Sequence, residues 1–224
     1  MLSLKQSLSL SSIDPLWNPY DEASLVAWYA NKTGITITSG NVSTWLDSSS
    51  NTHNMTNATL TEQPLYVTAS GALGFDPAKT QNLQTSSQIS LTGAFTIGIK
   101  LNPSAVNVTV LADNTTGGEF IKIQTSSKLR IKIDNSQADI DLDSGSFGDD
   151  YLVLTRNGSN LITLYRNGVA QADTETLSGT ADIDNIGVRS TDQNPYNGQI
   201  KEIQIYSSTS TELTYNINQR LATL

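Results

Sequence analysis

The sequence predicts an all-β protein, a two-sheet antiparallel jelly-roll sandwich with one short C-terminal helix and an extended N-terminal arm. The first indication is residues 151–169, YLVLTRNGSNLITLYRNGV, where Asn157-Gly158 joins two apolar runs and Asn167-Gly168 follows. Asn-Gly between β-rich runs is a strong hairpin signal, because tight hairpin turns need positive φ. The second is that short alternating segments separated by turn residues recur along the chain. The third is one stripe of apolar residues at helical spacing near the C-terminus.

The N-terminal segment differs from the rest, so we divide the chain into a docking arm, residues 1–20, and one jelly-roll domain, residues 21–224. The arm's leucines fall on one side of an extended segment, although two of them also suit one helical turn. We expect these leucines to dock on the chain's own domain or on a partner, with a tryptophan between two prolines as an anchor. The docking residues are Leu2, Leu4, Leu8, Leu10 and Trp17.

Short strands are expected through the first third of the domain. Residues 25–29 are apolar on both alternating faces, which suits a strand buried on both sides. Residues 42–47, 66–67 and 73–76 continue the pattern, with a Ser/Asn-rich loop at residues 48–54. Trp28 and Trp45 lie within these strands, so we expect both in the core.

From residue 94 the alternation predicts regular strands with one apolar face. Phe95, Ile97, Ile99 and Leu101 share one face of the first of them, and Thr96, Gly98 and Lys100 share the other. The inward residues of the next three are Val106, Val108 and Val110, then Ile121 and Ile123, then Leu129, Ile131 and Ile133.

A charged hairpin is expected around a turn at Asn135-Ser136. Lys128, Arg130 and Lys132 point outward on one strand, and Asp139, Asp141 and Asp143 point outward on the next. Opposite charges on the same face support this register, because cross-strand ion pairs contribute about 0.2–1 kcal/mol each.

The last part of the chain predicts two strands and a closing helix. Residues 183–188 form one strand and Ile200, Ile203 and Ile205 belong to the final one. Ser210 or Thr211 caps the helix, whose apolar stripe is Leu213, Ile217 and Leu221.

Composition excludes several classes of function. The net charge is −8 and only 15% of residues are charged, so non-specific nucleic-acid binding is not expected. The chain has no cysteine, which excludes disulfides and thiolate metal sites. No apolar run approaches the roughly 20 residues of a membrane helix. Serines interrupt the leucines of the N-terminus, so it lacks the form of a signal peptide.

Several segments, in this order, resemble the concanavalin A-like lectin/glucanase superfamily in its laminin-G-like or pentraxin-like branch. They are LVAWY at residues 25–29, VSTWLDSSSN at 42–51, LGFD at 73–76, FTI at 95–97, LITLYRNG at 161–168 and YNGQIKEIQIY at 196–206, followed by the closing helix. The resemblance covers about residues 20–224 and implies two curved antiparallel sheets. The fold hosts lectins, glycosidases, adhesive modules and viral particle proteins, so function has to be argued from the site.

The chain offers little for catalysis. The glucanase branch places acids at alternating positions on one strand, and Asp139, Asp141 and Asp143 are the nearest match. They face a basic strand that keeps them ionised, which favours a salt-bridged surface over an acid–base pair. His53 is the only histidine, lies in a polar loop, and offers too few ligands for zinc. We expect no enzymatic activity.

Calcium stays open, because it takes oxygen ligands from Asp, Asn and carbonyls in loops. The resemblance points the same way, since many laminin-G-like and pentraxin-like domains bind calcium at a loop edge. Turn chemistry explains the same side chains, so we assert no metal or other cofactor. The candidate ligands are Asp141, Asp143, Asp149, Asp150 and Asp192, with Asp182, Asp184 and Asn194 in similar loops.

These observations and the resemblance together predict a non-enzymatic virion protein. The arm docks on other virion proteins of a phage capsid or tail, and the lectin-like jelly-roll is displayed on the outer surface for glycan or host-surface adhesion. The sequence leaves open whether the arm instead joins copies of this chain. Two alternatives remain: a free carbohydrate-binding lectin, calcium-dependent or not, and a glycoside hydrolase or lyase.

Overall fold

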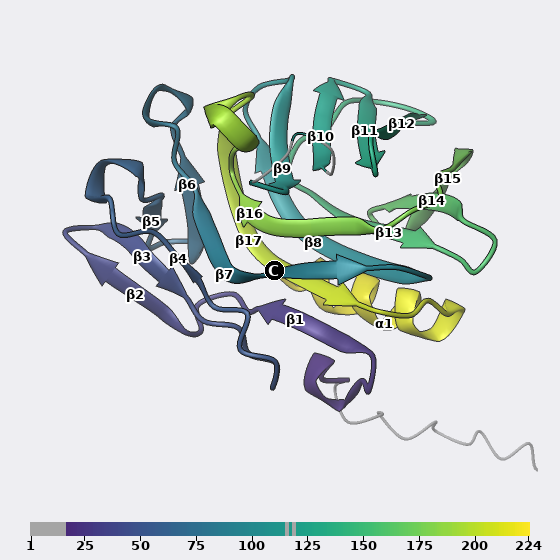
Figure 1. Ribbon diagram of the computed structural model, residues 1–224, viewed down its shortest axis with the longest axis horizontal. Helices are drawn as coiled ribbons and strands as arrows, with labels where there is room; N and C mark the ends of the chain where they lie inside the picture. The colour runs from purple at the N-terminus through teal and green to yellow at the C-terminus, as the bar shows by residue number, and fades with distance from the viewer. Residues whose placement is uncertain (1–16, 115–116, 118–119) are drawn as a thin grey trace, which may run out of the picture.

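The computed structural model describes residues 17–114, 117 and 120–224 (Figure 1). In these residues the chain is all-β, with one α-helix, α1 (Thr211–Ala222), and four short 3₁₀ helices, η1 (Pro19–Asp21), η2 (Leu60–Glu62), η3 (Pro77–Lys79) and η4 (Ser190–Asp192). The strands are β1 Leu25–Tyr29, β2 Ile35–Thr38, β3 Asn41–Trp45, β4 Met55–Thr56, β5 Leu65–Val67, β6 Ala72–Phe75, β7 Leu83–Leu91, β8 Phe95–Pro103, β9 Val108–Ala112, β10 Phe120–Thr125, β11 Lys128–Ile133, β12 Ser136–Asp141, β13 Asp150–Arg156, β14 Leu161–Arg166, β15 Val169–Thr176, β16 Ala181–Ile186 and β17 Gly198–Tyr206.

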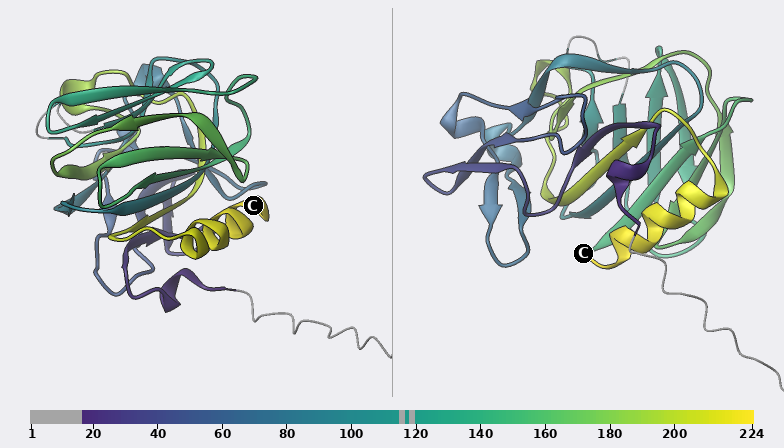
Figure 2. Two further views of the ribbon diagram at one scale, coloured as in Figure 1. Left: turned by 90° about the vertical axis from the view of Figure 1, so that its right-hand side faces the viewer. Right: turned by 90° about the horizontal axis from the view of Figure 1, so that it is seen from below.

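The strands form the two antiparallel layers expected of a jelly-roll sandwich (Figures 1 and 2). One layer has the order β1–β17–β8–β13–β14–β15, and the other has the order β12–β11–β10–β9–β16–β7–β4–β3–β2. β5 and β6 link the layers at one end, because β6 pairs with the start of β17 and β5 pairs with β3. The fold class predicted from the sequence is confirmed.

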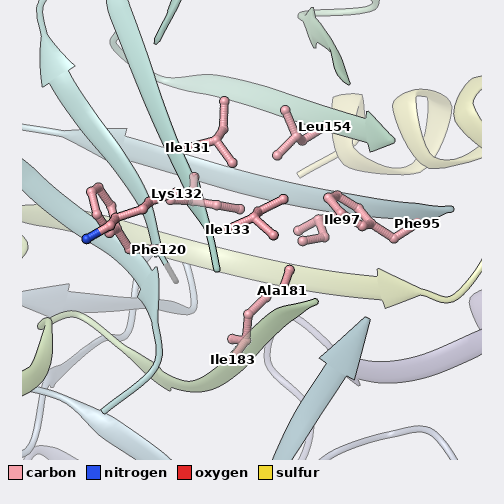
Figure 3. Close-up of a pocket in the computed structure, with 10 residues that line it drawn as sticks. Phe95, Ile97, Phe120, Ile131, Lys132, Ile133, Leu154, Ala181 and Ile183 are labelled. Atoms are coloured by element: carbon pink, nitrogen blue, oxygen red, sulfur yellow. The ribbon is translucent and has the colours of Figure 1, made fainter. Parts of the chain in front are cut away.

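The core lies between the two layers and is densely packed. Figure 3 shows Ile97 and Leu154 of one layer facing Ile131, Ile133 and neighbouring apolar residues of the other. The space left among them is about 10 Å³, which is room for at most one water molecule. A ligand therefore has to bind on the outside of the sandwich.

The two hairpins around β14 use different turns. Asn157 begins a longer connection in which its Oδ1 accepts the N–H of Leu161 (3.0 Å), and Asn160 takes positive φ (63°). Asn167 and Gly168 both have positive φ (51° and 81°), as a type I′ turn requires. The predicted hairpins are confirmed, and the tight Asn-Gly turn is the second pair.

The charged hairpin β11–β12 has the predicted register. Lys128 Nζ lies 2.9 Å from Asp141 Oδ1, and Arg130 Nε lies 2.6 Å from Asp139 Oδ1. Its turn is at Asp134–Asn135, where both residues have positive φ, one residue earlier than expected.

Helix α1 covers the outer face of β8 and β13 (Figure 2). Ser210 caps it by accepting the N–H of Leu213 (3.0 Å), and the predicted apolar stripe is buried. A Cβ on Gly98 would lie 2.5 Å from Ile217 Cγ2, so the helix can seat only on a glycine there. The expectation of one apolar face for β8 was incomplete, because the helix buries its second face as well.

A buried ion pair fixes the C-terminal end of α1. Glu202 on β17 is fully buried, and its carboxylate accepts bonds from Arg220 Nε (2.5 Å) and from Trp28 Nε1 (3.1 Å). The Arg220 guanidinium lies 4.7 Å from the centre of the Trp28 ring. Trp45 is in the core as predicted, whereas Trp28 is only half-buried at this ion pair.

Arg156 ends β13 as a fully buried cation without a carboxylate contact among the described residues. Its guanidinium donates to the carbonyls of Leu91 (2.9 Å), Gly93 (2.8 Å) and Gly179 (2.8 Å), and it lies 4.7 Å from the centre of the Phe95 ring. Burial lowers the pKa of Arg156. The side chain therefore ties two loops to the end of the sandwich.

The expected inward position of Val106 was wrong. It precedes β9 in the 104–107 turn and is 49% exposed. Asn107 with positive φ (60°) keeps this segment out of the ladder.

Candidate functional site

A cleft of about 360 Å³ opens at the end of the sandwich where β5 and β6 link the layers. One wall comes from β5, another from the 76–81 turn after β6, and the third from the segment that leads into β17. The lining residues are Asn41, Leu65, Val67, Gly74, Phe75, Asp76, Lys79, Gln81, Ser104, Asn197, Gly198 and Gln199.

This cleft, called the groove below, combines side-chain amides that lack a hydrogen-bond partner among the described residues with an exposed apolar side chain. The side-chain amides of Asn41 and Asn197 make no hydrogen bond to any residue in the described part of the chain. Leu65 is 51% exposed and offers a flat aliphatic patch beside them. Asp76 and Lys79 form an exposed pair at the rim, with Nζ 3.9 Å from Oδ2. The walls of the groove therefore offer hydrogen-bond donors, hydrogen-bond acceptors and an apolar surface close together.

The floor of the groove is rigid. Phe75 meets Tyr196 edge-on with ring centres 5.5 Å apart, and burial raises the pKa of Tyr196 far above its ordinary value. Gln81 is held by two bonds, accepting from Asp76 N (2.6 Å) and donating to Gln63 O (2.7 Å). These contacts hold Phe75 and Gln81 in place at the floor of the groove.

A second cleft, of about 350 Å³, is lined almost entirely by polar side chains. They are Thr56, Asn57, Glu62, Asn82, Gln84, Asn114 and Asp192. Nearby, burial and the charges of Asp113 and Asp182 raise the pKa of Asp184, which accepts the N–H of Asn114 (2.7 Å). This cleft lacks the apolar surface that organic ligands pack against, so the first groove is the stronger candidate.

The acidic strand is paired with cations. The Arg130 guanidinium holds the pKa of Asp139 below its ordinary value, and Asp141 is paired with Lys128. Asp143 lies beyond the end of β12, where it accepts the N–H of Ala172 (2.9 Å). A general acid needs a raised pKa, so Asp139 is unsuited to that role.

The calcium candidates are dispersed. Asp149 lies 2.9 Å from Lys100 Nζ, and Asp150 lies 3.0 Å from Arg166 Nε, whereas Asp192 borders the second cleft. Within the described ranges no group of three or more His, Cys, Asp or Glu residues is arranged to hold a metal ion.

His53 has a serine neighbour but no triad. Ser87 Oγ lies 3.2 Å from His53 Nδ1, whereas the Asp47 carboxylate accepts the backbone N–H of His53 (3.0 Å) rather than one from its ring. A triad requires the acid to orient the imidazole. Asp47 also accepts the backbone N–H groups of Trp28 (2.9 Å) and Ser49 (2.8 Å), so the WLDSSSN segment organises a loop.

Only one of the predicted docking residues can be placed. Leu2, Leu4, Leu8 and Leu10 lie outside the described residues. Trp17 packs on the chain's own domain, with its ring centre 6.4 Å from that of Tyr206 and its Nε1 donating to Glu22 Oε1 (2.9 Å). Trp17 is therefore held on the chain's own domain by Tyr206 and Glu22.

Sequence reasoning missed the groove itself. Asn197 lies inside the YNGQ segment that contributed to the family resemblance, and Asn41 follows the Ser39-Gly40 turn, which has positive φ at both residues (52° and 84°). A polar residue directly after a tight turn was the available signal. Their proximity depends on the β3–β5 and β6–β17 pairings, which join segments far apart in sequence.

Comparison with known sequences gives one match. Residues 77–213 match the family model of the concanavalin A-like lectin/glucanases superfamily. No curated protein sequence matches the chain. No described helix is long and apolar enough to cross a membrane.

Solved structures share the fold at low sequence identity. Domain 4 of AbnA, an extracellular arabinanase from Geobacillus stearothermophilus solved with arabinotriose, superposes with a TM-score of 0.61 at 16% identity, over 89% of this chain and 100% of that one. The binding domain of Paraclostridial Mosquitocidal Protein 1 gives 0.60 at 14%, and the botulinum neurotoxin serotype C1 binding domain gives 0.55 at 14%, each over 92% of this chain. The chain spans about half the length, 53%, of these two toxin domains.

Proposed function

We propose that this chain, which belongs to the concanavalin A-like lectin/glucanases superfamily, is a non-catalytic carbohydrate-binding module that uses the groove around Asn41, Leu65 and Asn197. The observation that carries the proposal is the pair of unengaged amides beside an exposed aliphatic surface on a rigid floor. The full-length match to an arabinanase domain solved with arabinotriose supports the same class of ligand.

The groove chemistry fits a neutral sugar. Each sugar ring presents hydroxyl groups that donate and accept, together with a C–H face that packs on apolar surface. Asn41 and Asn197 supply donors and acceptors, and Leu65 supplies the apolar contact. The rim has one acid and one base, Asp76 and Lys79, so it does not select strongly for a charged ligand.

Binding without turnover is part of the proposal. Hydrolysis needs two carboxylates facing each other across one cleft, and the groove is lined by a single acid, Asp76. The outward acids of β12 lie on a different surface and are paired with Lys128 and Arg130.

The test is a glycan array with the full chain, followed by calorimetric titration of the oligosaccharides that bind. Asn41→Ala and Asn197→Ala should each weaken binding roughly 2- to 10-fold, because a net hydrogen bond contributes about 0.5–1.5 kcal/mol. Gln137→Ala, an exposed amide on β12, is the matched control and should leave affinity unchanged. Binding should persist in EDTA. If the unmodified chain, Asn41→Ala, Asn197→Ala and Gln137→Ala all bind the sugar with equal affinity, the sugar site lies elsewhere. Gln84→Ala would then test the second cleft.

A second proposal concerns how the module is attached to a larger particle, and it retains the virion role expected from the sequence. We infer that the arm attaches this module to a larger assembly such as a phage particle. The leucine pattern of residues 2–10 and the packing of Trp17 on Tyr206 of the domain support it. In density-gradient fractionation of particles, the Leu4→Asp/Leu8→Asp chain should stay with small soluble species. Its retention on the particles would refute arm-mediated attachment.

A further inference from the structure

A third cleft, of about 290 Å³, opens where α1 begins, beside the hairpin of β13 and β14. Hydroxyl groups dominate its lining, and we call it the hydroxyl cleft. They come from the two strands, from the loop after β17 and from the first turn of α1. None of the described residues that line it is charged. Its hydroxyl-bearing residues include Thr163, Tyr165, Thr209, Thr211 and Thr214.

The sequence of β14 explains one wall of the hydroxyl cleft. Ile162 and Leu164 are fully buried in the core, so the alternate residues Leu161, Thr163 and Tyr165 face outward. Leu161 is 38% exposed, and Tyr165 packs against the apolar cluster beneath α1. This wall therefore offers apolar surface next to hydroxyl groups.

Thr214 is the feature of this cleft that points to a ligand. It is only 5% exposed, and its hydroxyl makes no hydrogen bond to any described residue. A threonine inside a helix commonly bonds the carbonyl four residues earlier, but here the Ser210 carbonyl accepts the backbone N–H of Thr214 (3.0 Å) and not its hydroxyl. A nearly buried hydroxyl without a partner costs free energy. A ligand oxygen in the cleft would supply that partner.

Other polar groups around Thr214 are free as well. The hydroxyls of Thr163, Tyr165 and Thr209 have no hydrogen-bond partner in the part of the chain that the structure describes. The helix adds the backbone N–H of Thr211, because the first N–H groups of a helix have no acceptor within it. Donors and acceptors therefore meet at the cleft from α1, from the preceding loop and from β14.

We propose that the hydroxyl cleft binds one residue of a neutral sugar, as a second site separate from the groove. Sugar hydroxyls both donate and accept, as threonine hydroxyls do, and the C–H face of the ring can pack on Leu161 and Tyr165. An anion fits less well, although a helix N-terminus attracts one. No described lysine or arginine lines the cleft, Glu212 lies in the first turn of α1, and the net charge of the chain is −8. The class of ligand rests on the proposed function, whereas the site rests on its own residues.

The two sites lie at opposite ends of β17. The groove contains Gly198 and Gln199 at the start of this strand, whereas the hydroxyl cleft contains Thr209, which follows its end at Tyr206. The nine residues of β17 extend roughly 26 Å at about 3.3 Å per residue. Figure 1 likewise shows β5 and β6 at the left and β14 at the right. One chain could therefore hold two points of a polysaccharide, and binding to the polymer would gain from avidity.

Protein NMR measures the two sites separately. The full ¹⁵N-labelled chain is titrated to millimolar concentrations with arabinose, arabinotriose, xylose, glucose, galactose and mannose in turn. We expect saturable shifts of the Thr211 and Glu212 amide signals with at least one of these sugars. Thr214→Val and Thr163→Val keep the side-chain shape but remove a hydroxyl, so each should weaken binding at this site roughly 2- to 10-fold. Thr174→Val, at an exposed position on β15, is the matched control and should leave the affinity unchanged.

The outcomes separate this proposal from that of the groove. If none of the sugars shifts the Thr211 and Glu212 signals, or if both Thr214→Val and Thr163→Val fold and bind with unchanged affinity, the second site is refuted. Shifts confined to Asn41 and Asn197 would also refute it and would support the groove. Shifts confined to Thr211 and Glu212 would support the hydroxyl cleft and refute the groove. The two valine variants lie on different elements, so if one does not fold the other still gives the result.

Discussion

Replacing Arg156 by methionine should destabilise the protein without changing its surface. The side chain is fully buried, and its guanidinium satisfies the carbonyls of Leu91, Gly93 and Gly179. Methionine fills part of the volume but donates nothing. The three carbonyls then lose their donor, and the free energy of unfolding should fall.

The size of the effect follows from the burial of each carbonyl. The Leu91 carbonyl is in a buried contact, so leaving it unpaired costs about 1–3 kcal/mol. The carbonyls of Gly93 and Gly179 are in partly buried contacts, and each lost bond costs about 0.5–1.5 kcal/mol. Removing a desolvated cation offsets part of the sum. We expect a net loss of about 3 kcal/mol against a total stability of roughly 5–15 kcal/mol.

Urea denaturation followed by tryptophan fluorescence measures this loss. Arg130→Met is the matched control, because the ion pair of Arg130 with Asp139 lies on the outer face and contributes about 0–1 kcal/mol. Arg156→Lys keeps the charge but cannot span three carbonyls, so it should remain well below wild type. If Arg156→Met unfolds within about 0.5 kcal/mol of wild type, the three bonds do not stabilise the fold as argued. Full stability in Arg156→Lys would assign the effect to charge alone.

Three further changes have expected outcomes. Gly98→Val places side-chain atoms where Ile217 packs, so near-ultraviolet circular dichroism should show a displaced helix and thermal unfolding should start earlier; an unchanged melting curve contradicts the tight seat. Arg220→Met leaves the buried Glu202 carboxylate without its cation, which should cost about 3–5 kcal/mol in urea unfolding; a loss below 1 kcal/mol refutes this. Burial raises the pKa of Asp184, so its ionisation destabilises the folded state as pH rises above about 4; Asp184→Asn should therefore raise the melting temperature at pH 7 and have little effect at pH 3. A larger gain at pH 3 than at pH 7 would reverse the sign and contradict the reasoning.

Local pattern was sufficient to predict much of the fold. Period-two alternation identified the β11–β12 hairpin and its ion pairs, because one face is apolar and the other carries opposite charges. The closing helix followed from Ser210 and three apolar residues at helical spacing. These elements are determined by neighbours in sequence, which is why a single chain reveals them.

What depends on distant contacts could not be predicted in the same way. Arg156 follows Thr155 and precedes Asn-Gly, a pattern typical of an exposed strand end, yet the carbonyls of Leu91, Gly93 and Gly179 enclose it. Asn41 and Asn197 become neighbours of one groove only through sheet pairings across more than half of the chain. Val106 has the right spacing for a strand, but the positive φ of Asn107 ends the alternation there.

The last strand of the chain is an interior strand of its layer. β17 lies between β1 and β8, so two strands made early in synthesis each lack a neighbour until residue 206 has emerged. Contacts of this sequence separation slow folding and leave strand edges exposed in the meantime. A stop codon near residue 195 would therefore remove β17, which would leave β1 without a neighbour in its layer and β8 with only β13 beside it.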